Sequence, residues 1–294
     1  MKVDISSVIL NESDSDDPRQ NTPKPFIQRE VTSYDIVRTC FSDIEPIIRK
    51  RKISTVDNAF ANNAQEQEAV VMDFFAHMLA SEENFDNAKL EKFTDVVVEL
   101  NCWLFKICAR YMIFDEIMFV GIYIMYKYLS QPISPPAGDR LYLICGVCLN
   151  IANKIQRCNG CIKPSRMIQT EARFMQYTVK DFVDAELCVM QTLEWKFENI
   201  RSPHEFIDYF LSTINIHPKI QKTARSCAKK CIISTDFLFL LPSKLGVYCL
   251  LASCLHHGHS FYYCEILARY GMSGSNNDEI RNIAHSISSL IVRV

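Results

Sequence analysis

Glycine is scarce in this chain, whose 294 residues include 8 glycines beside 11 prolines. Loops that bind phosphate need glycine where backbone N–H groups approach the ligand closely, and neither a GxGxxG nor a GxxxxGK(S/T) motif occurs here. The HExxH motif of zinc proteases and the GxSxG motif of many hydrolases are missing as well. These absences argue against the commonest nucleotide-binding and hydrolytic enzymes.

Neither an excess of charge nor a long apolar run is present. The 32 Lys and Arg residues nearly balance the 34 Asp and Glu residues, for a formal net charge of -2, which argues against broad binding of nucleic acid or anionic lipid. The longest apolar runs, 117–126 and 246–255, fall short of the roughly 18 residues that cross a bilayer. Residues 1–10 lack the apolar stretch of a secretory signal. We therefore expect an intracellular protein of the nucleus or cytoplasm, with no membrane partner.

Cysteine, in contrast, is abundant. The chain has 13 cysteines, an odd number that fits reduced thiols inside the cell. The spacing of Cys145, Cys148, Cys158 and Cys161 superficially resembles that of a zinc site. However, Cys145 and Cys148 belong to the apolar stretch 141–152, where cysteine acts as a small hydrophobic residue. We favour this packing role over zinc and predict no metal ion or other cofactor.

Histidine is concentrated at His256, His257 and His259. These residues follow an apolar helical stretch, so we interpret them as a solvated helix end. A metal ion bound by the three imidazoles is the alternative.

The apolar pattern divides the chain into four parts. Residues 1–30 are polar and acidic, which predicts a disordered arm, and a helical extension is expected over 31–90. Helical spacing is clear from residue 91 onward. Ser202-Pro203-His204-Glu205 then forms a capping box that begins a new helix. We therefore place one helical bundle at 91–200 and a second at 201–294.

Three helices are predicted early in the first bundle. Apolar residues repeat at three- and four-residue steps over 93–111, Asp115 can cap a second helix that ends at Leu129, and Asp139 can cap a third. This third helix is apolar nearly all round over 141–152, which predicts a helix surrounded by others. Since no alternating strand pattern of useful length is present, the predicted fold class is all-α, with two small helical bundles in tandem.

Glu186 lies where a carboxylate is costly. Thr178 and Asp181 form a helix-start signal, and Phe182 and Val189 mark the apolar face of the helix that follows. Glu186 lies on that same face. A buried carboxylate needs hydrogen-bond donors, which come either from within the fold or from a partner.

Several of these segments together resemble the cyclin family. Their order and spacing reproduce those of the cyclin box. The segments are Tyr128-Leu129-Ser130, residues 141–154, Tyr177-Thr178, Glu186 and Leu193-Glu194-Trp195-Lys196-Phe197. The resemblance has motif support over about 92–197 and continues to about 291 in helix order and apolar pattern alone. It implies two tandem five-helix bundles of the cyclin type.

The resemblance also implies a kinase-binding site. In cyclins a lysine and a glutamate bind the main chain of the kinase segment that leads into its regulatory helix, and the matching positions here are Lys154 and Glu186. An ammonium group donates to carbonyl oxygens and a carboxylate accepts from N–H groups, so neither depends on the partner's side chains. Trp195 is a candidate aromatic residue of the same interface. The alternatives are a lysine that interacts with the helix dipole, a salt bridge within the chain, and core packing of Trp195.

A second implied site is a groove for substrates. Cyclins that recruit substrates dock an Arg-x-Leu type motif beside the first box helix, where this chain has Val96, Leu100, Trp103 and Tyr142. Glu99 replaces an apolar position of that groove, which favours a more basic motif. Core packing of Val96, Leu100 and Trp103 is the alternative.

Val97 and Tyr126 stand where cyclins have a buried Arg–Asp pair that links the first two box helices. Because both charged partners are replaced together, no buried charge is left unpaired, and the fold is not endangered. The replacement marks the chain as a divergent member.

The function implied by the resemblance is that of a non-catalytic regulatory subunit. Such a subunit forms a heterodimer with a cyclin-dependent kinase, activates it by shifting its conformational equilibrium, and acts in cell-cycle control, with kinase substrates as further partners. No residue of this chain would be catalytic.

Two alternatives remain open. The first is a nucleic-acid-binding protein similar to transcription factor IIB, for which Lys222, Arg225, Lys229 and Lys230 form a local basic cluster. Against it, residues 1–90 contain only Cys40 and so cannot form the zinc ribbon of those proteins. The second alternative is a scaffold of the same fold that binds no kinase.

Overall fold

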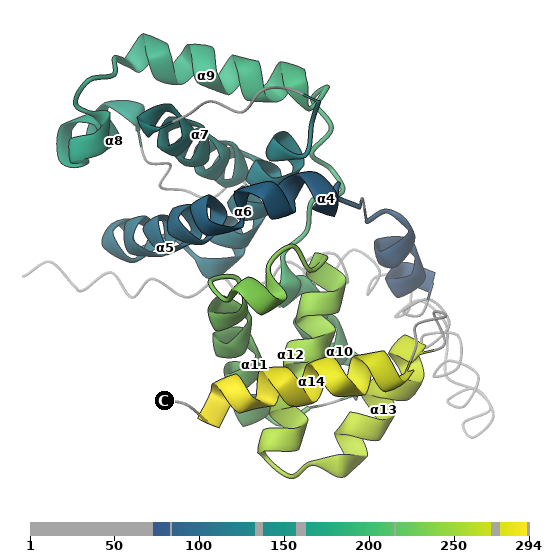
Figure 1. Cartoon of the computed structure of the whole chain (residues 1–294). Helices are drawn as coiled ribbons and strands as arrows, with labels where there is room; N and C mark the ends of the chain where they lie inside the picture. The colour runs from purple at the N-terminus through teal and green to yellow at the C-terminus, as the bar shows by residue number, and fades with distance from the viewer. Residues whose placement is uncertain are drawn as a thin grey trace, which may run out of the picture.

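The structure, a computed structural model, describes residues 73–82, 84–132, 138–156, 163–214, 216–271 and 277–292. Within these ranges the chain is mainly helical and contains no β-strand. Figure 1 shows the helices in two groups, α4–α9 and α10–α14. The predicted all-α class with two tandem bundles is therefore confirmed. The predicted arm at 1–30 and the thiols Cys158 and Cys161 lie outside the described residues.

In the part of the chain that the structure describes, the first bundle contains six helices, of which the first, α4, is a single turn. Its helices are α4 (Asn87–Leu90), α5 (Thr94–Tyr111), α6 (Asp115–Leu129), α7 (Asp139–Ile155), α8 (Pro164–Thr170) and α9 (Val179–Thr192). Short 3-10 segments occupy Glu91–Phe93 and Ala172–Phe174. Residues 73–80 are also helical, and the Phe75 ring in that segment stacks on Tyr209 of the second bundle with 4.4 Å between centroids.

The second bundle is built around one apolar helix. Its helices are α10 (Pro203–Ile214), α11 (Pro218–Cys231), α12 (Pro242–His256), α13 (Ser260–Gly271) and α14 (Asn277–Val292), with a 3-10 segment at Thr235–Phe237. The central helix is α12, which packs against the other four.

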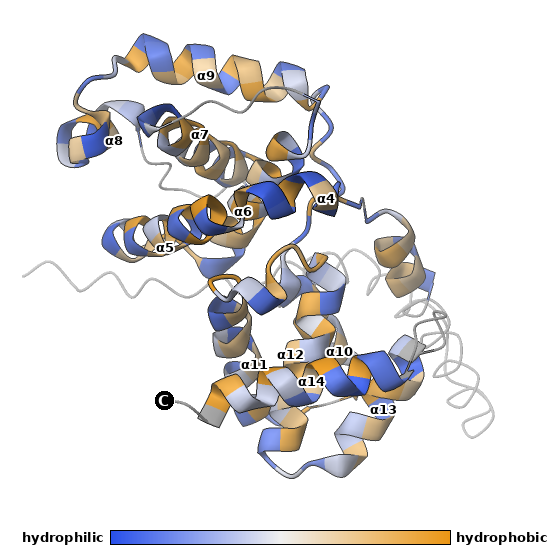
Figure 2. Cartoon of the chain, in the orientation of Figure 1, coloured by the Kyte–Doolittle hydropathy of each residue, from blue (hydrophilic) through white to orange (hydrophobic). Residues whose placement is uncertain are grey.

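Helix α7 has the same central role in the first bundle. Every residue from Leu141 to Asn153 is buried, as the all-round apolar pattern predicts. Helix α7 packs against α5, α6 and α9, and Figure 2 shows its hydrophobic ribbon between the more hydrophilic ribbons of α5 and α9. Helix α7 reaches the surface only at its two ends, at Asp139 and Arg140 and again from Lys154 onward.

Local signals fix several helix starts. Thr178 and Asp181 form a reciprocal capping box at the start of α9, as predicted. At the start of α10, the Glu205 carboxylate accepts from the Ser202 N–H at 2.9 Å. The predicted capping role of Asp115 is wrong, because Phe114 precedes α6 in extended backbone and Asp115 is already helical. Asp139 likewise begins α7 instead of capping it.

Buried polar contacts join the two bundles. The Asn101 amide of α5 donates to the Tyr126 hydroxyl at 2.7 Å and to the backbone carbonyl of Ile232 at 2.6 Å. At the contact between α6 and α11, Glu116 lies 3.3 Å from Arg225. Arg225 also binds both carboxylate oxygens of Asp208, each at 2.7 Å. These contacts fix the second bundle against α5 and α6.

Among the described residues, no helix is long and apolar enough to cross a membrane.

Gly246 allows α12 to approach α10 closely. A Cβ atom at this position would lie 2.5 Å from the backbone carbonyl oxygen of Pro203. We expect Gly246→Ala to destabilise the protein by about 1–3 kcal/mol, because neither helix can retreat without disturbing the core. Urea unfolding of the full chain measures this free energy.

Gly146→Ala is the matched control for Gly246→Ala. Its Cβ would contact the ends of the Met167 and Phe174 side chains at 3.2 and 3.3 Å. These groups can shift, and alanine favours a helix by about 1 kcal/mol over glycine. A Gly246→Ala variant as stable as the Gly146→Ala variant would contradict this account of the packing.

Glu116 makes stability depend on acid pH. Burial raises the pKa of this carboxyl, but the hydrogen bond and charge of His204 and the charge of Arg225 outweigh that effect and lower it to about 2. Because the pKa of Glu116 is lower in the folded chain than in the unfolded chain, its carboxylate stabilises the fold fully at a pH above the unfolded pKa of 4.5. This stabilisation is lost as the pH falls from about 4.5 to about 2. As the pH is lowered through this window, the unfolding temperature should therefore decrease less steeply in Glu116→Gln than in the wild type.

The control for Glu116→Gln is Glu265→Gln, which removes an ion pair between neighbouring turns of α13. Its unfolding temperature should follow the wild-type pH profile. Parallel profiles for the wild type and Glu116→Gln would contradict the role of the Glu116 carboxylate.

Candidate kinase-binding site

Lys154 and Glu186 meet at the surface of the first bundle. Lys154 lies in the last turn of α7, where a cation is favoured by the helix dipole, and Glu186 comes from the middle of α9. Their side chains form an ion pair. The Lys154 side chain is 49% exposed and that of Glu186 is 14% exposed. The structure thus brings the two predicted residues together, and the salt bridge considered as an alternative for them is present.

The ion pair leaves hydrogen-bonding capacity for a partner. An ammonium group has three donors and a carboxylate accepts at both oxygens. Among the described residues, the second Glu186 oxygen accepts only a long bond of 3.5 Å, from the Asn150 amide. The carbonyl oxygen of that amide is buried and has no hydrogen-bond partner within the same described ranges. Polar atoms with incomplete hydrogen bonding therefore lie beside the pair.

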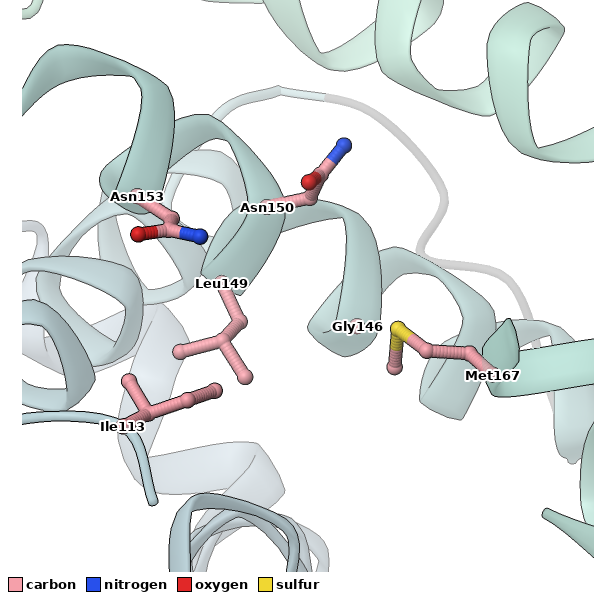
Figure 3. Close-up of a pocket in the computed structure, with 6 residues that line it drawn as sticks. All are labelled: Ile113, Gly146, Leu149, Asn150, Asn153 and Met167. Atoms are coloured by element: carbon pink, nitrogen blue, oxygen red, sulfur yellow. The ribbon is translucent and has the colours of Figure 1, made fainter. Parts of the chain in front are cut away.

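The cavity that the described residues form beneath this surface is small. Figure 3 shows the Asn150 side chain pointing away from Leu149 and Ile113, which face each other on the other side of α7. The cavity that these residues help to line has a volume of about 10 Å³, enough for about one water molecule. The site is therefore suited to a macromolecular partner that binds at the surface.

An exposed apolar row on α9 runs beside Glu186. It consists of Val179, Val183 and Leu187, which we call the α9 stripe, and their exposed fractions are 48%, 54% and 45%. Ile155, next to Lys154, is also 38% exposed. A contiguous exposed apolar row is a common feature of protein-binding surfaces. Sequence analysis missed the stripe, although its four-residue spacing was visible.

Trp195 lies apart from the ion pair. It follows the end of α9, nine residues after Glu186, and adopts a left-handed backbone conformation with φ of 61°. Its side chain is 59% exposed, so it does not have the core-packing role considered as the alternative. Trp195 is available at the surface, but no described contact joins it to Lys154 or Glu186.

The expected substrate groove is only partly exposed. Val96 is 40% exposed, Trp103 is half-buried, and Tyr142 is buried. Leu100 is 0% exposed, so this residue packs in the core and offers no surface to a peptide. The Trp103 ring packs edge-on against Tyr142, with 5.4 Å between centroids.

Glu99 already has partners within the chain. Its carboxylate accepts from the Tyr142 hydroxyl and lies 3.6 Å from the Arg173 guanidinium. That guanidinium covers the Tyr142 ring at 3.9 Å from the centroid. Burial, followed by the hydrogen bond that the Tyr142 hydroxyl donates to Glu99, raises the pKa of Tyr142 to about 12. A basic peptide would have to compete with Arg173 for Glu99.

The two residues that replace the buried Arg–Asp pair are both in the core. Val97 is 0% exposed and Tyr126 is 1% exposed. The Tyr126 hydroxyl accepts a hydrogen bond from Asn101, one helical turn after Val97. A neutral hydrogen bond therefore links α5 and α6 at this point. This agrees with the prediction that replacing both members of the Arg–Asp pair leaves no buried charge unpaired.

The thiols that lie closest together among the described residues are not those of the zinc-like sequence motif. Cys145 and Cys148 are buried in α7, and burial raises the pKa of both. A closer thiol group, Cys227, Cys231 and Cys249, has all sulfur atoms within 4.8 Å of one another. Sequence analysis missed this group. Burial raises the pKa of Cys249, so that thiol stays protonated and packs as a small apolar group.

The three histidines form a partly exposed cluster at the end of α12. The rings of His256 and His257 are 4.9 Å apart between centroids, and the His257 ring nitrogen lies 2.9 Å from the Thr223 hydroxyl. Burial and then the charge of His256 lower the pKa of His257. Within the described residues, these imidazoles do not converge as metal ligands.

Comparisons with known proteins identify the family. The description "Cyclin, N-terminal domain" fits residues 75–198, which include Lys154, Glu186 and the α9 stripe. Residues 75–198 are a divergent member of the cyclin family. They contain all of α4–α9, whereas α10–α14 lie beyond them.

The curated relatives of this chain are distant in sequence. G1/S-specific cyclin-D1 of Danio rerio is 22% identical over 148 residues, covering 49% of each chain. The protein of the same name from Canis lupus familiaris is 23% identical over 164 residues, covering 54% of each chain. The chain thus spans about half the length of the curated relatives it matches.

The cyclin fold extends beyond the sequence match. The structure of a viral cyclin from herpesvirus saimiri aligns with a TM-score of 0.60 at 16% identity, covering 76% of this chain and 97% of the viral chain. Since the match to the family description ends at residue 198, this larger coverage includes helices of the second bundle.

Proposed function

We propose that this chain is a non-catalytic regulatory subunit that binds and activates a cyclin-dependent kinase. The observation that carries the proposal is the half-exposed Lys154–Glu186 pair beside the α9 stripe. Lys154 would donate to main-chain carbonyl groups of the kinase, and Glu186 would accept from its N–H groups. The stripe would cover apolar residues of the same kinase segment. Trp195 would contact the kinase beyond the end of α9.

Activation would follow from binding alone. A kinase needs a glutamate of its regulatory helix paired with the lysine that contacts ATP phosphates. A partner that binds only the inward position of this helix shifts the kinase population toward the active state. The cyclin-D1 names of the curated relatives support a role in cell-cycle control.

A substrate-docking role is proposed for the surface around Val96, Trp103 and Tyr142. Its acidic residue, Glu99, favours a basic residue in the docked motif, and Arg173 is the group that this residue would displace. Such a substrate would bind at α5, apart from the kinase at α9.

We expect Lys154→Ala and Glu186→Ala to weaken kinase binding at least tenfold. Each removes main-chain contacts to the kinase, while the loss of a partly exposed ion pair changes folding stability by only about 0–1 kcal/mol. The test is a pulldown with tagged full-length variants from a lysate of the source organism, followed by identification and activity measurement of the bound kinase. Circular dichroism checks that helicity is intact.

Two further variants sharpen this pulldown. Val183→Asp places a charge within the α9 stripe and should also abolish kinase recovery. Ile233→Asp changes a residue of similar exposure outside the proposed interface and should retain the kinase. If no kinase is recovered, the kinase-binding proposal is wrong, and the scaffold and nucleic-acid-binding alternatives take its place. If both Ala variants retain the kinase fully, the proposed role of Lys154 and Glu186 is wrong.

A further inference from the structure

A groove of about 320 Å³ lies between the two bundles. It is lined by the C-terminal part of α5, the start of α6 and the last turns of α11. Figure 1 shows α11 on the side of the first bundle that is remote from α9. The groove therefore lies away from Glu186 and the α9 stripe, although Ile113 lines both the groove and the small cavity beside Asn150. Its volume lies within the usual range of binding pockets.

The walls of the groove are largely apolar. Phe105 and Ile113 of the first bundle and Ile233 of the second contribute to its lining. Ile233 is 40% exposed. The loop between α5 and α6 adds exposed apolar surface, because Met112 is 81% exposed and Phe114 is 42% exposed. Such a patch at a junction between bundles is typical of a surface that binds another protein.

The backbone of this loop is also unusual. Met112 adopts a left-handed conformation with φ of 53°, which is costly for a residue with a side chain. In that conformation the N–H of Ile113 still donates to the Cys108 carbonyl at 2.9 Å. The loop is thus held at the end of α5, with Ile113 in the lining of the groove and the preceding residue, Met112, exposed.

Positive charge borders the groove on the α11 side. Helix α11 carries five Lys and Arg residues and no Asp or Glu. Lys229 and Lys230 line the groove, and Lys222 and Ser226 are exposed on the preceding turns of the same helix. The one acidic residue of the lining, Asp115, is paired with Lys229 at 2.8 Å. The net charge at the groove is therefore positive.

These features indicate which kind of partner fits. Arg225 of the basic cluster points inward to Asp208 and Glu116, so the cluster does not form the continuous basic face that nucleic acid requires. In addition, the apolar side chains of Phe105, Ile113 and Ile233 offer no favourable interaction to phosphate groups. A peptide with bulky apolar side chains and carboxylates complements both parts of the groove.

We propose that the inter-bundle groove is a docking site for a partner-protein segment that combines bulky apolar residues with acidic residues. The apolar side chains enter between α5 and α11, and the carboxylates pair with Lys229 and Lys230. Because the groove and α9 lie on different sides of the first bundle, a bound segment leaves the kinase-binding surface open.

The test is selection of peptides against the full chain. A phage-displayed library of random 12-residue peptides is selected on wild-type protein, and enriched sequences are synthesised with a fluorescent dye. We expect peptides that combine acidic and bulky apolar residues. Their affinity, measured by fluorescence polarisation, should fall at least tenfold for Ile233→Asp. It should also fall for Lys230→Gln, with a weaker dependence on salt than in the wild type.

Val183→Asp is the matched control, because it changes an exposed apolar residue of α9 and should bind the peptides like the wild type. This control also separates the docking proposal from the kinase proposal, since Val183→Asp should lose the kinase and keep the peptide. The docking proposal is overturned if no acidic and apolar sequence is enriched, or if Ile233→Asp binds the enriched peptides as well as the wild type. It is equally overturned if a labelled oligonucleotide binds the groove and the peptides do not.

Discussion

The burial of α7 is the constraint on which the first bundle depends. Its residues from Leu141 to Asn153 are all buried, and each large aliphatic side chain among them contributes about 1.5–3 kcal/mol when it leaves water. Helices α5, α6 and α9 must therefore pack around it. The helix reaches solvent only at its two ends, and at its C-terminal end Lys154 meets Glu186 of α9. The position of the proposed kinase-binding pair thus follows from the packing of the core.

The contacts between bundles form a second level of organisation. Asn101, Glu116 and Arg225 connect the first bundle to the second through neutral and charged hydrogen bonds. Because these contacts are partly or fully buried, removing one partner would leave the other without compensation. They hold α11 against the ends of α5 and α6, and the groove lies beside this junction. The α9 stripe therefore belongs to the first bundle alone, whereas the groove is formed by both bundles where they join.

Sequence reasoning predicted the fold where local patterns are strong. The all-round apolar pattern of α7 identified a central helix, and Thr178 with Asp181 identified the start of α9. Glu186 was found because a carboxylate on an apolar face requires a partner. The exact start of α6 was missed, because Asp115 is compatible with both the capping position and the first helical turn.

Other features depend on contacts that no local pattern contains. The α9 stripe and the buried row of Phe182 and Val189 have similar helical spacing, so periodicity alone does not tell which row faces solvent. Asn101 binds the carbonyl of Ile232, 131 residues away. From its position on α5, Leu100 appeared equally suited to the substrate groove and to the core. In the structure it is buried by neighbouring helices and therefore belongs to the core.

Hydrogen–deuterium exchange tests the central claim most directly. The full chain is compared alone and in complex with the kinase that it recovers, with exchange followed by mass spectrometry. Binding through Lys154, Glu186 and the α9 stripe predicts slower exchange at the end of α7 and along α9, with little change in α11. Protection confined to α11 or to the rest of the second bundle, with α9 unchanged, would contradict the account.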